Sequence, residues 1–169
     1  KDAIVADETI TANLDLFKTF TFAGTDDYYS GRGGGIGQGL AGAIGVAVAQ
    51  PERPVLCLSG DGSSMYSIQA LWTAAHHELA IVFVILANRE YRVLKHNIDA
   101  YRARFDVKSN KPYMHMDLGG PTMGFVDMAK GMGVAGTYVA QADDIKAAVA
   151  AAFKTGKPHL IEIEIEGKR

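Results

Sequence analysis

The stretch Val55-Leu-Cys-Leu-Ser-Gly-Asp-Gly-Ser-Ser64 decides the fold class, because it joins an apolar strand to a glycine turn and a helix start. Val55–Leu58 is apolar without alternation, as in a strand covered on both faces. A helix is expected over Met65–His77, and a second, continuously apolar strand follows over Ala80–Leu86. Two such strands on either side of a helix are typical of a parallel sheet wrapped by helices.

The same alternation extends along the rest of the chain. We expect further strands over Ala3–Ala6, Val134–Val139 and His159–Ile165, and helices over Thr9–Phe20, Ile36–Gln50, Tyr91–Tyr101, Phe125–Met132 and Ala142–Thr155. Thr21–Ser30 is expected to be a loop or a short strand, and Phe105–Gly120 a loop. The prediction is a three-layer, doubly wound α/β fold, with a mostly parallel sheet and helices on both faces.

Length and composition exclude several classes of protein. The chain has 169 residues and a net charge of −2, so it lacks the excess of basic residues that is typical of nucleic-acid-binding proteins. The single Cys57 excludes a disulfide framework or a cysteine-based metal centre. The longest apolar runs are shorter than the roughly 20 residues that span a bilayer. We therefore expect a soluble, cytoplasmic protein, and with no repeat or linker we expect residues 1–169 to form a single domain.

Ligands of such sheets bind at the carboxyl ends of the strands, where this chain carries two oxygen-bearing side chains. Asp61 follows the first buried strand within a Gly-Asp-Gly turn whose free N–H groups suit a phosphate. Asn88 follows the next strand, with twenty-five residues between it and Gly62. A divalent cation such as Mg²⁺ would let Asp61 lie beside a phosphate, with Asn88 and the Glu90 carbonyl as further ligands. The alternatives are a helix-capping aspartate and an ordinary turn asparagine.

These motifs resemble those of a known family. Gly60-Asp61-Gly62 followed by Asn88, together with the stretches Gly33–Gly37, Gly60–Leu71 and Ala87–Tyr91, is similar to the thiamine-diphosphate motif of the 2-oxoacid decarboxylase and acetolactate synthase family. The resemblance covers nearly the whole chain and corresponds to the C-terminal, diphosphate-binding domain. It implies a fragment or subunit of a larger enzyme that acts on a 2-oxoacid, a small-molecule substrate.

The resemblance also implies roles for individual residues. Asp61, Asn88 and the carbonyl of Glu90 would bind Mg²⁺, although the family commonly has glycine where this chain has Arg89. The Gly34 carbonyl would face the aminopyrimidine ring of thiamine diphosphate, and Ile36 would support the bend between its rings. The cofactor-binding set implied by the family is Thr11, Gly34, Gly35, Ile36, Gly60, Gly62, Ser63, Tyr66 and Tyr91.

No catalytic residue is expected in this chain. In the family, the glutamate that activates the aminopyrimidine lies in an N-terminal pyrimidine-binding domain that another subunit supplies, and Glu8 does not correspond to it. The resemblance therefore implies a partner domain absent from these residues and at least a homodimer. The glycine-rich, apolar stretch Gly31–Gly45 also favours association, because an uncovered apolar face is rare in monomers. The loop at 105–120 is expected to be poorly ordered without that partner domain.

Two other functions stay open on the sequence alone. Gly37-Gln-Gly39-Leu-Ala-Gly42, with Asp61 nineteen residues later, fits the dinucleotide fingerprint of an oxidoreductase. However, it follows the polar run Asp26–Ser30 instead of a buried strand, and it leaves Asn88 unexplained. A non-catalytic subunit that has kept the fold of a thiamine enzyme is the other alternative.

Overall fold

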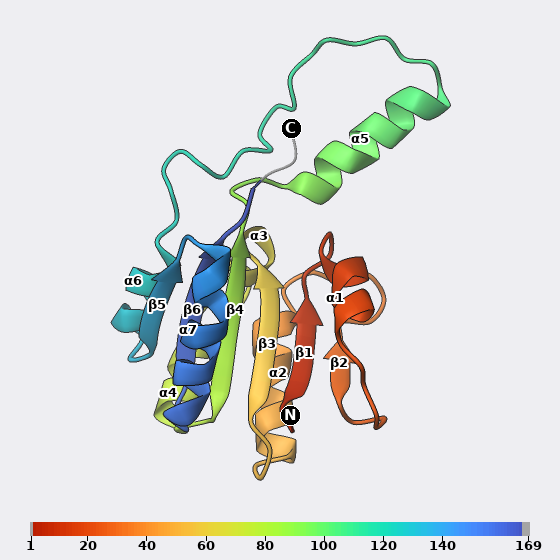
Figure 1. Ribbon diagram of the computed structural model, residues 1–169. Helices are drawn as coiled ribbons and strands as arrows, with labels where there is room; N and C mark the ends of the chain where they lie inside the picture. Colours follow the sequence, from red (N-terminus) through yellow and green to blue (C-terminus); the bar gives the residue numbers. More distant parts are fainter. Residues whose placement is uncertain (1, 167–169) are drawn as a thin grey trace.

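Six parallel strands form one sheet at the centre of this computed structural model, which describes residues 2–166 (Figure 1). The strand order is β2-β1-β3-β4-β6-β5, and every neighbouring pair is parallel. The strands are β1 Ile4–Glu8, β2 Tyr28–Ser30, β3 Val55–Gly60, β4 Ile81–Ala87, β5 Ala135–Val139 and β6 His159–Glu164. The predicted doubly wound α/β fold is confirmed.

Helices cover both faces of the sheet. The helices are α1 Asn13–Thr19, α2 Gly39–Ala49, α3 Asp61–Ser64, α4 Ala70–His76, α5 Arg92–Arg104, α6 Phe125–Gly131 and α7 Ala142–Lys154. On one face, α2, α4 and α6 bury a core centred on Phe83 and Leu71. On the other face, α7 packs against the side chains of Val82, Val84 and Ile161. None of the described helices is long and apolar enough to cross a membrane.

The order of the strands places a crevice at the carboxyl edge of the sheet. The chain runs from β1 outward to β2 and then returns to the far side of β1 as β3, so the winding reverses between β1 and β3. Ligands of open parallel sheets bind where the winding reverses. The segments that follow β1, β3 and β4 all emerge at this edge (Figure 1).

Three of the predicted helices are shorter than expected, because polar contacts hold their first residues in turns. The helix predicted from Thr9 begins at Asn13, since the Asp7 carboxylate accepts hydrogen bonds from the amide and hydroxyl of Thr9. The helix predicted from Ile36 begins at Gly39. The helix predicted over Met65–His77 forms only over its second half, as α4. The residues before α4 form the single helical turn α3 and then a series of turns with hydrogen bonds between residues three positions apart.

The burial of the two faces of β3 also differs from the prediction. Val55 and Cys57 are fully buried beneath α2 and α4, whereas Leu56 and Leu58 on the opposite face are only half-buried. The difference arises because α7 packs chiefly over β4, β5 and β6. β4, in contrast, is buried on both faces, as its unbroken apolar sequence predicts.

Helix α5 and the segment after it form an arm that extends beyond the carboxyl edge (Figure 1). No residue of α5 is buried. Residues 105–116 contain no helix or strand, as predicted, and return along α5 through the hydrogen bond from Tyr113 to Asp99 and that from Arg102 to the Lys111 carbonyl. The order of this loop in solution stays a prediction.

The central core gives the first testable expectation. Phe83 is fully buried beneath α2, α4 and α6, so Phe83→Ala leaves a cavity and should lower the free energy of unfolding by about 3–5 kcal/mol. Leu14→Ala is the control, because Leu14 is 73% exposed and its loss should change stability by no more than about 0.5 kcal/mol. Urea unfolding followed by circular dichroism measures both. Equal effects of the two substitutions would contradict the described packing.

Candidate functional site

The predicted metal and phosphate residues meet at the ends of two neighbouring strands. Gly60, the last residue of β3, pairs with Leu86 of β4, so Asp61 and Asn88 leave the sheet side by side. Together they line a small cavity of about 60 Å³. The other lining residues are Thr9, Ile10, Thr11, Ile36, Gly60, Gly62, Ser63, Glu90, Tyr91, Arg92 and Val93.

Asp61 is a buried carboxylate that pairs with no cationic side chain of the described residues. It is 3% exposed, and its oxygens accept hydrogen bonds from the amides of Gly62 at 2.8 Å and Arg89 at 2.6 Å. Burial raises the pKa of Asp61 in spite of these two hydrogen bonds. A buried carboxylate is costly unless a positive charge compensates it. The position therefore suits a cation that completes the coordination of the carboxylate.

Asn88 and Glu90 can supply the remaining oxygen ligands. The side-chain oxygen of Asn88 accepts a hydrogen bond from the Glu90 amide at 3.1 Å, which orients the turn. The Glu90 carboxylate is occupied, because it pairs with Arg92 at 3.0 Å and with Lys95. Burial opposes its ionisation, but the hydrogen bonds from Lys95 and Arg92 prevail and lower its pKa. The main-chain carbonyl of Glu90, in contrast, accepts no hydrogen bond from a described residue and is available to a cation.

The chemistry of this donor set fits a hard divalent cation. Across residues 2–166, no group of three His, Cys, Asp or Glu side chains could hold a metal ion. One carboxylate, one amide oxygen and one carbonyl instead form a site with few protein ligands. Magnesium is commonly bound in this manner, with phosphate oxygens and water completing an octahedral shell.

The turn after Asp61 is shaped to admit a phosphate group. A Cβ atom at Gly62 would lie 2.8 Å from the Tyr91 ring, so only glycine fits beneath that ring. Ser63 is buried at the start of α3, beside the same cavity. The predicted phosphate residues Gly60, Gly62 and Ser63 are therefore brought together with Tyr91, while Thr11 lies exposed at the rim.

The glycine segment forms a second cavity beside the first. Gly34 and Gly35 line a space of about 410 Å³ between the ends of β1 and β2, at the base of the arm. Ile36 lines both cavities and is 42% exposed, so it lies between the predicted metal site and the glycine segment. The role that the resemblance implies for Ile36, beneath the bend between the cofactor's rings, stays a prediction.

The structure does not place Tyr66 with the other predicted residues. Tyr66 is 60% exposed and lines neither cavity. It packs on the outside of the glycine turn, where a Cβ atom at Gly37 would lie 2.4 Å from the Cβ of Tyr66. A contact between Tyr66 and a cofactor therefore stays a prediction.

Sequence reasoning missed the acidic pair at the end of β1. Asp7 and Glu8 are buried and line the larger cavity. The Asp7 carboxylate accepts hydrogen bonds from Thr9, from Asn13 at 2.6 Å and from the hydroxyl of Tyr28 at 2.7 Å. Two adjacent acidic residues directly after an apolar run were the available signal, because charged side chains at a buried strand end must have partners.

Arg89 links the metal turn to the far half of the sheet. It adopts a φ of 57°, and its guanidinium lies 3.8 Å from the Glu162 carboxylate and 3.9 Å from that of Glu164. Both glutamates belong to β6, the neighbour of β4. An arginine is therefore accommodated where the family commonly has glycine.

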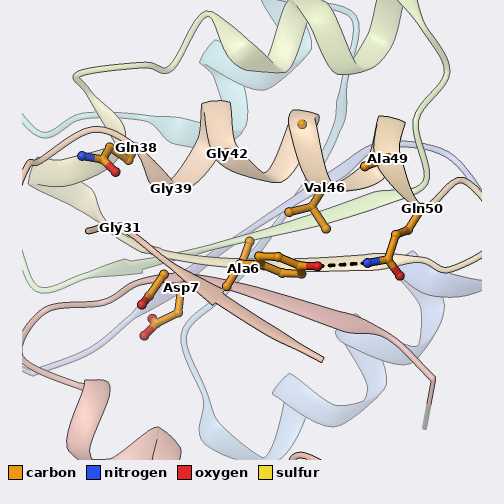
Figure 2. Close-up of a pocket in the computed structure, with 12 residues that line it drawn as sticks. Ala6, Asp7, Gly31, Gln38, Gly39, Gly42, Val46, Ala49 and Gln50 are labelled. Atoms are coloured by element: carbon orange, nitrogen blue, oxygen red, sulfur yellow. Dashed lines mark hydrogen bonds between the residues drawn. The ribbon is translucent and has the colours of Figure 1, made fainter. Parts of the chain in front are cut away.

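A third cavity, of about 390 Å³, shares no lining residue with the cavity at Asp61 and Asn88 (Figure 2). It is bounded by the glycine-rich side of α2 and by β1 and β2, and the hydroxyl of Tyr29 accepts a hydrogen bond from Gln50 across it. Asp7 is the only charged residue among those that line it. A cavity lined by so few charged side chains suits contact with another protein surface better than catalysis.

A parallel sheet with a buried carboxylate, an amide oxygen and a glycine turn at adjacent strand ends is an arrangement suited to a domain that binds a phosphorylated ligand. Comparison with known families makes the assignment specific. Residues 11–163 match the family described as "Thiamine pyrophosphate enzyme, C-terminal TPP binding domain", and the chain belongs to this family. Thiamine pyrophosphate is another name for thiamine diphosphate. The dinucleotide alternative receives no support.

Individual relatives agree with this assignment. The chain is 39% identical over 163 residues to a putative acetolactate synthase large subunit of Mycobacterium tuberculosis, covering 96% of this chain and 32% of that protein. It is 31% identical over 163 residues to benzoylformate decarboxylase of Pseudomonas aeruginosa, covering 96% of this chain and 29% of that protein. The chain thus spans about a third of the length of these relatives.

A solved structure shares the fold closely. The thiamine diphosphate-dependent 4-hydroxybenzoylformate decarboxylase of Rhodococcus jostii superposes with a TM-score of 0.86 at 33% identity, over 99% of this chain and 30% of that one. The family identified from the motifs is therefore confirmed, and both acetolactate synthases and benzoylformate decarboxylases are among the relatives.

Proposed function

We propose that this chain holds thiamine diphosphate through Mg²⁺ as the cofactor-anchoring part of a larger enzyme that acts on 2-oxoacids, either a decarboxylase or an acetolactate synthase-like carboligase. The observation that carries the proposal is the pair of oxygen ligands, Asp61 and Asn88, at the ends of adjacent strands in a chain of this family. Thiamine diphosphate supplies the carbon nucleophile and electron sink for such reactions.

The residues of this chain would bind and orient the cofactor. Asp61, Asn88 and the Glu90 carbonyl would hold Mg²⁺, and the amides of Gly62 and Ser63 would donate hydrogen bonds to the diphosphate. Ile36 would support the bend between the two rings of the cofactor, and the Gly34 carbonyl would face its aminopyrimidine ring. The length of the relatives supports a further, pyrimidine-binding domain outside these residues. The proposal includes a cytoplasmic location for this enzyme.

The metal site has a direct test. Asp61→Ala should weaken the magnesium-dependent binding of thiamine diphosphate by about a hundredfold or more, because it removes the only charged ligand. Asn88→Leu should weaken binding in the same way but less, since it removes a neutral ligand. Titration calorimetry with and without Mg²⁺ measures both, and circular dichroism reports the fold.

The control for these variants is Asp127→Ala, which removes a carboxylate that is 85% exposed on α6. Its affinity for the cofactor should equal that of the unmodified chain. Unchanged affinity in Asp61→Ala would refute the metal site.

We also expect the isolated 169-residue chain to be inactive toward 2-oxoacids, even with saturating cofactor. The family's activating glutamate has no counterpart in these residues, and Glu8 is occupied by three backbone amides. Measuring CO₂ release from benzoylformate and from pyruvate tests the expectation. Turnover above that of the Asp61→Ala variant would overturn it.

We further propose that the chain associates at least as a symmetric homodimer through the exposed side of α2. A Cβ atom at Gly42 or Gly45 would meet nothing within 4 Å, and Val48 on this helix is 62% exposed. Glycine inside a helix costs about 1 kcal/mol relative to alanine, so two glycines without a close neighbour in their own chain favour a partner surface.

Gly45→Leu should therefore raise the dissociation constant of the dimer by about tenfold or more, while the monomer remains folded. Ala150→Leu is the matched control, because it enlarges an exposed position of α7. Sedimentation equilibrium measures the association of each. A monomeric unmodified chain at high concentration, or equal association of Gly45→Leu, would contradict this interface.

A further inference from the structure

Glu8 is a buried carboxylate that reaches across about thirty residues of sequence to the start of α2. It is the last residue of β1 and is 8% exposed. One carboxylate oxygen accepts hydrogen bonds from the amides of Gly37 at 2.5 Å and Gln38 at 3.1 Å, and the other accepts one from Gly39 at 2.8 Å. All three donors are consecutive backbone amides.

This contact supplies what the sequence of α2 lacks. The N-cap residue Gln38 makes no side-chain capping hydrogen bond, and the first turn contains no acidic residue. The first amides of a helix have no partner within the helix, and a negative charge near them is stabilising. The carboxylate of Glu8 therefore serves as the cap of α2 from a different element of the fold.

The same contact determines where the glycine segment lies. Gly37 adopts a φ of 88°, a conformation that larger residues rarely adopt, and its amide belongs to the peptide that joins it to Ile36. The Glu8 hydrogen bond to this amide thus holds the peptide directly after Ile36. Glu8, Gly34 and Ile36 all line the larger cavity, and Ile36 also borders the metal site.

We propose that Glu8 is a positioning residue for the ring end of the cofactor. By holding the Gly37–Gly39 amides, it places Ile36 and the Gly34 carbonyl where the rings of thiamine diphosphate would lie. Glu8 does not line the cavity formed by the turns after β3 and β4, where the metal and the diphosphate would lie. This inference rests on the proposed function and separates the site into a diphosphate part and a ring part.

Two probes distinguish the two parts of the site. Magnesium pyrophosphate would contact only the diphosphate part, whereas magnesium thiamine diphosphate would contact both. In the complete polypeptide that contains this chain, Glu8→Gln should weaken thiamine diphosphate about tenfold, equivalent to about 1.4 kcal/mol, and leave pyrophosphate affinity within about twofold. The glutamine amide presents one N–H₂ group where an acceptor is needed, so at least one of the three amides loses its partner.

The matched control is Asp27→Asn, which alters a carboxylate of similar hydrogen bonding far from the site. Asp27 accepts hydrogen bonds from the amides of Ala23 and Gly24 and pairs with Arg53 at 2.7 Å. Its loss should lower the melting temperature without changing the affinity for either probe. Should Glu8→Gln fail to fold, Glu8→Asp replaces it, because the shorter side chain keeps the charge but cannot span all three amides.

Each outcome of the titrations has a definite meaning. Weaker thiamine diphosphate with unchanged pyrophosphate supports the positioning role. Equal loss of both ligands would overturn it, since Glu8 would then act only through general stability, and unchanged affinity for both would overturn it as well. If the unmodified protein binds neither ligand, the proposed function itself is refuted.

Discussion

The arrangement of the carboxyl edge depends on one constraint, which is that buried carboxylates must be satisfied. Asp7, Glu8 and Asp61 lie in the last two residues of a strand or directly after one, Glu162 lies two residues before the end of β6, and all four are at least 92% buried. Each accepts hydrogen bonds from backbone amides of neighbouring or distant loops. Because leaving such a group unpaired costs several kcal/mol, each carboxylate determines the path of the loop that supplies its partners.

Asp61 differs from the other three carboxylates in the number and charge of its partners. Glu8 receives three amides, and Glu162 receives two amides together with the nearby Arg89 guanidinium. Asp61 has two amides and no cationic side chain within ion-pair distance among residues 2–166. Its environment therefore remains suited to a cation from outside the chain, and this explains why a carboxylate can lie beside a turn that attracts phosphate.

The proposed ligands come from neighbouring strands in one half of the sheet, and the surfaces near them are exposed. The strand ends of β1, β3 and β4 hold all the proposed ligands, while the arm of α5 rises beside them without a single buried residue (Figure 1). A Cβ atom added at Gly42 or Gly45 of α2 would likewise meet no atom of the described residues within 4 Å. Both features agree with a domain that forms about a third of its relatives.

The sequence by itself determined the fold class and most of the proposed metal site. The apolar runs over Val55–Leu58 and Ala80–Leu86 predict two neighbouring parallel strands, and their pairing brings Asp61 and Asn88 to one edge of the sheet. The late start of α2, the broken helix before Ala70 and the partners of Glu8 were decided only by the tertiary structure. The start of α2 and the partners of Glu8 depend on hydrogen bonds between residues about thirty positions apart, for which a single sequence carries no local signal. The break before Ala70 consists of local turns, which the apolar periodicity does not distinguish from a helix.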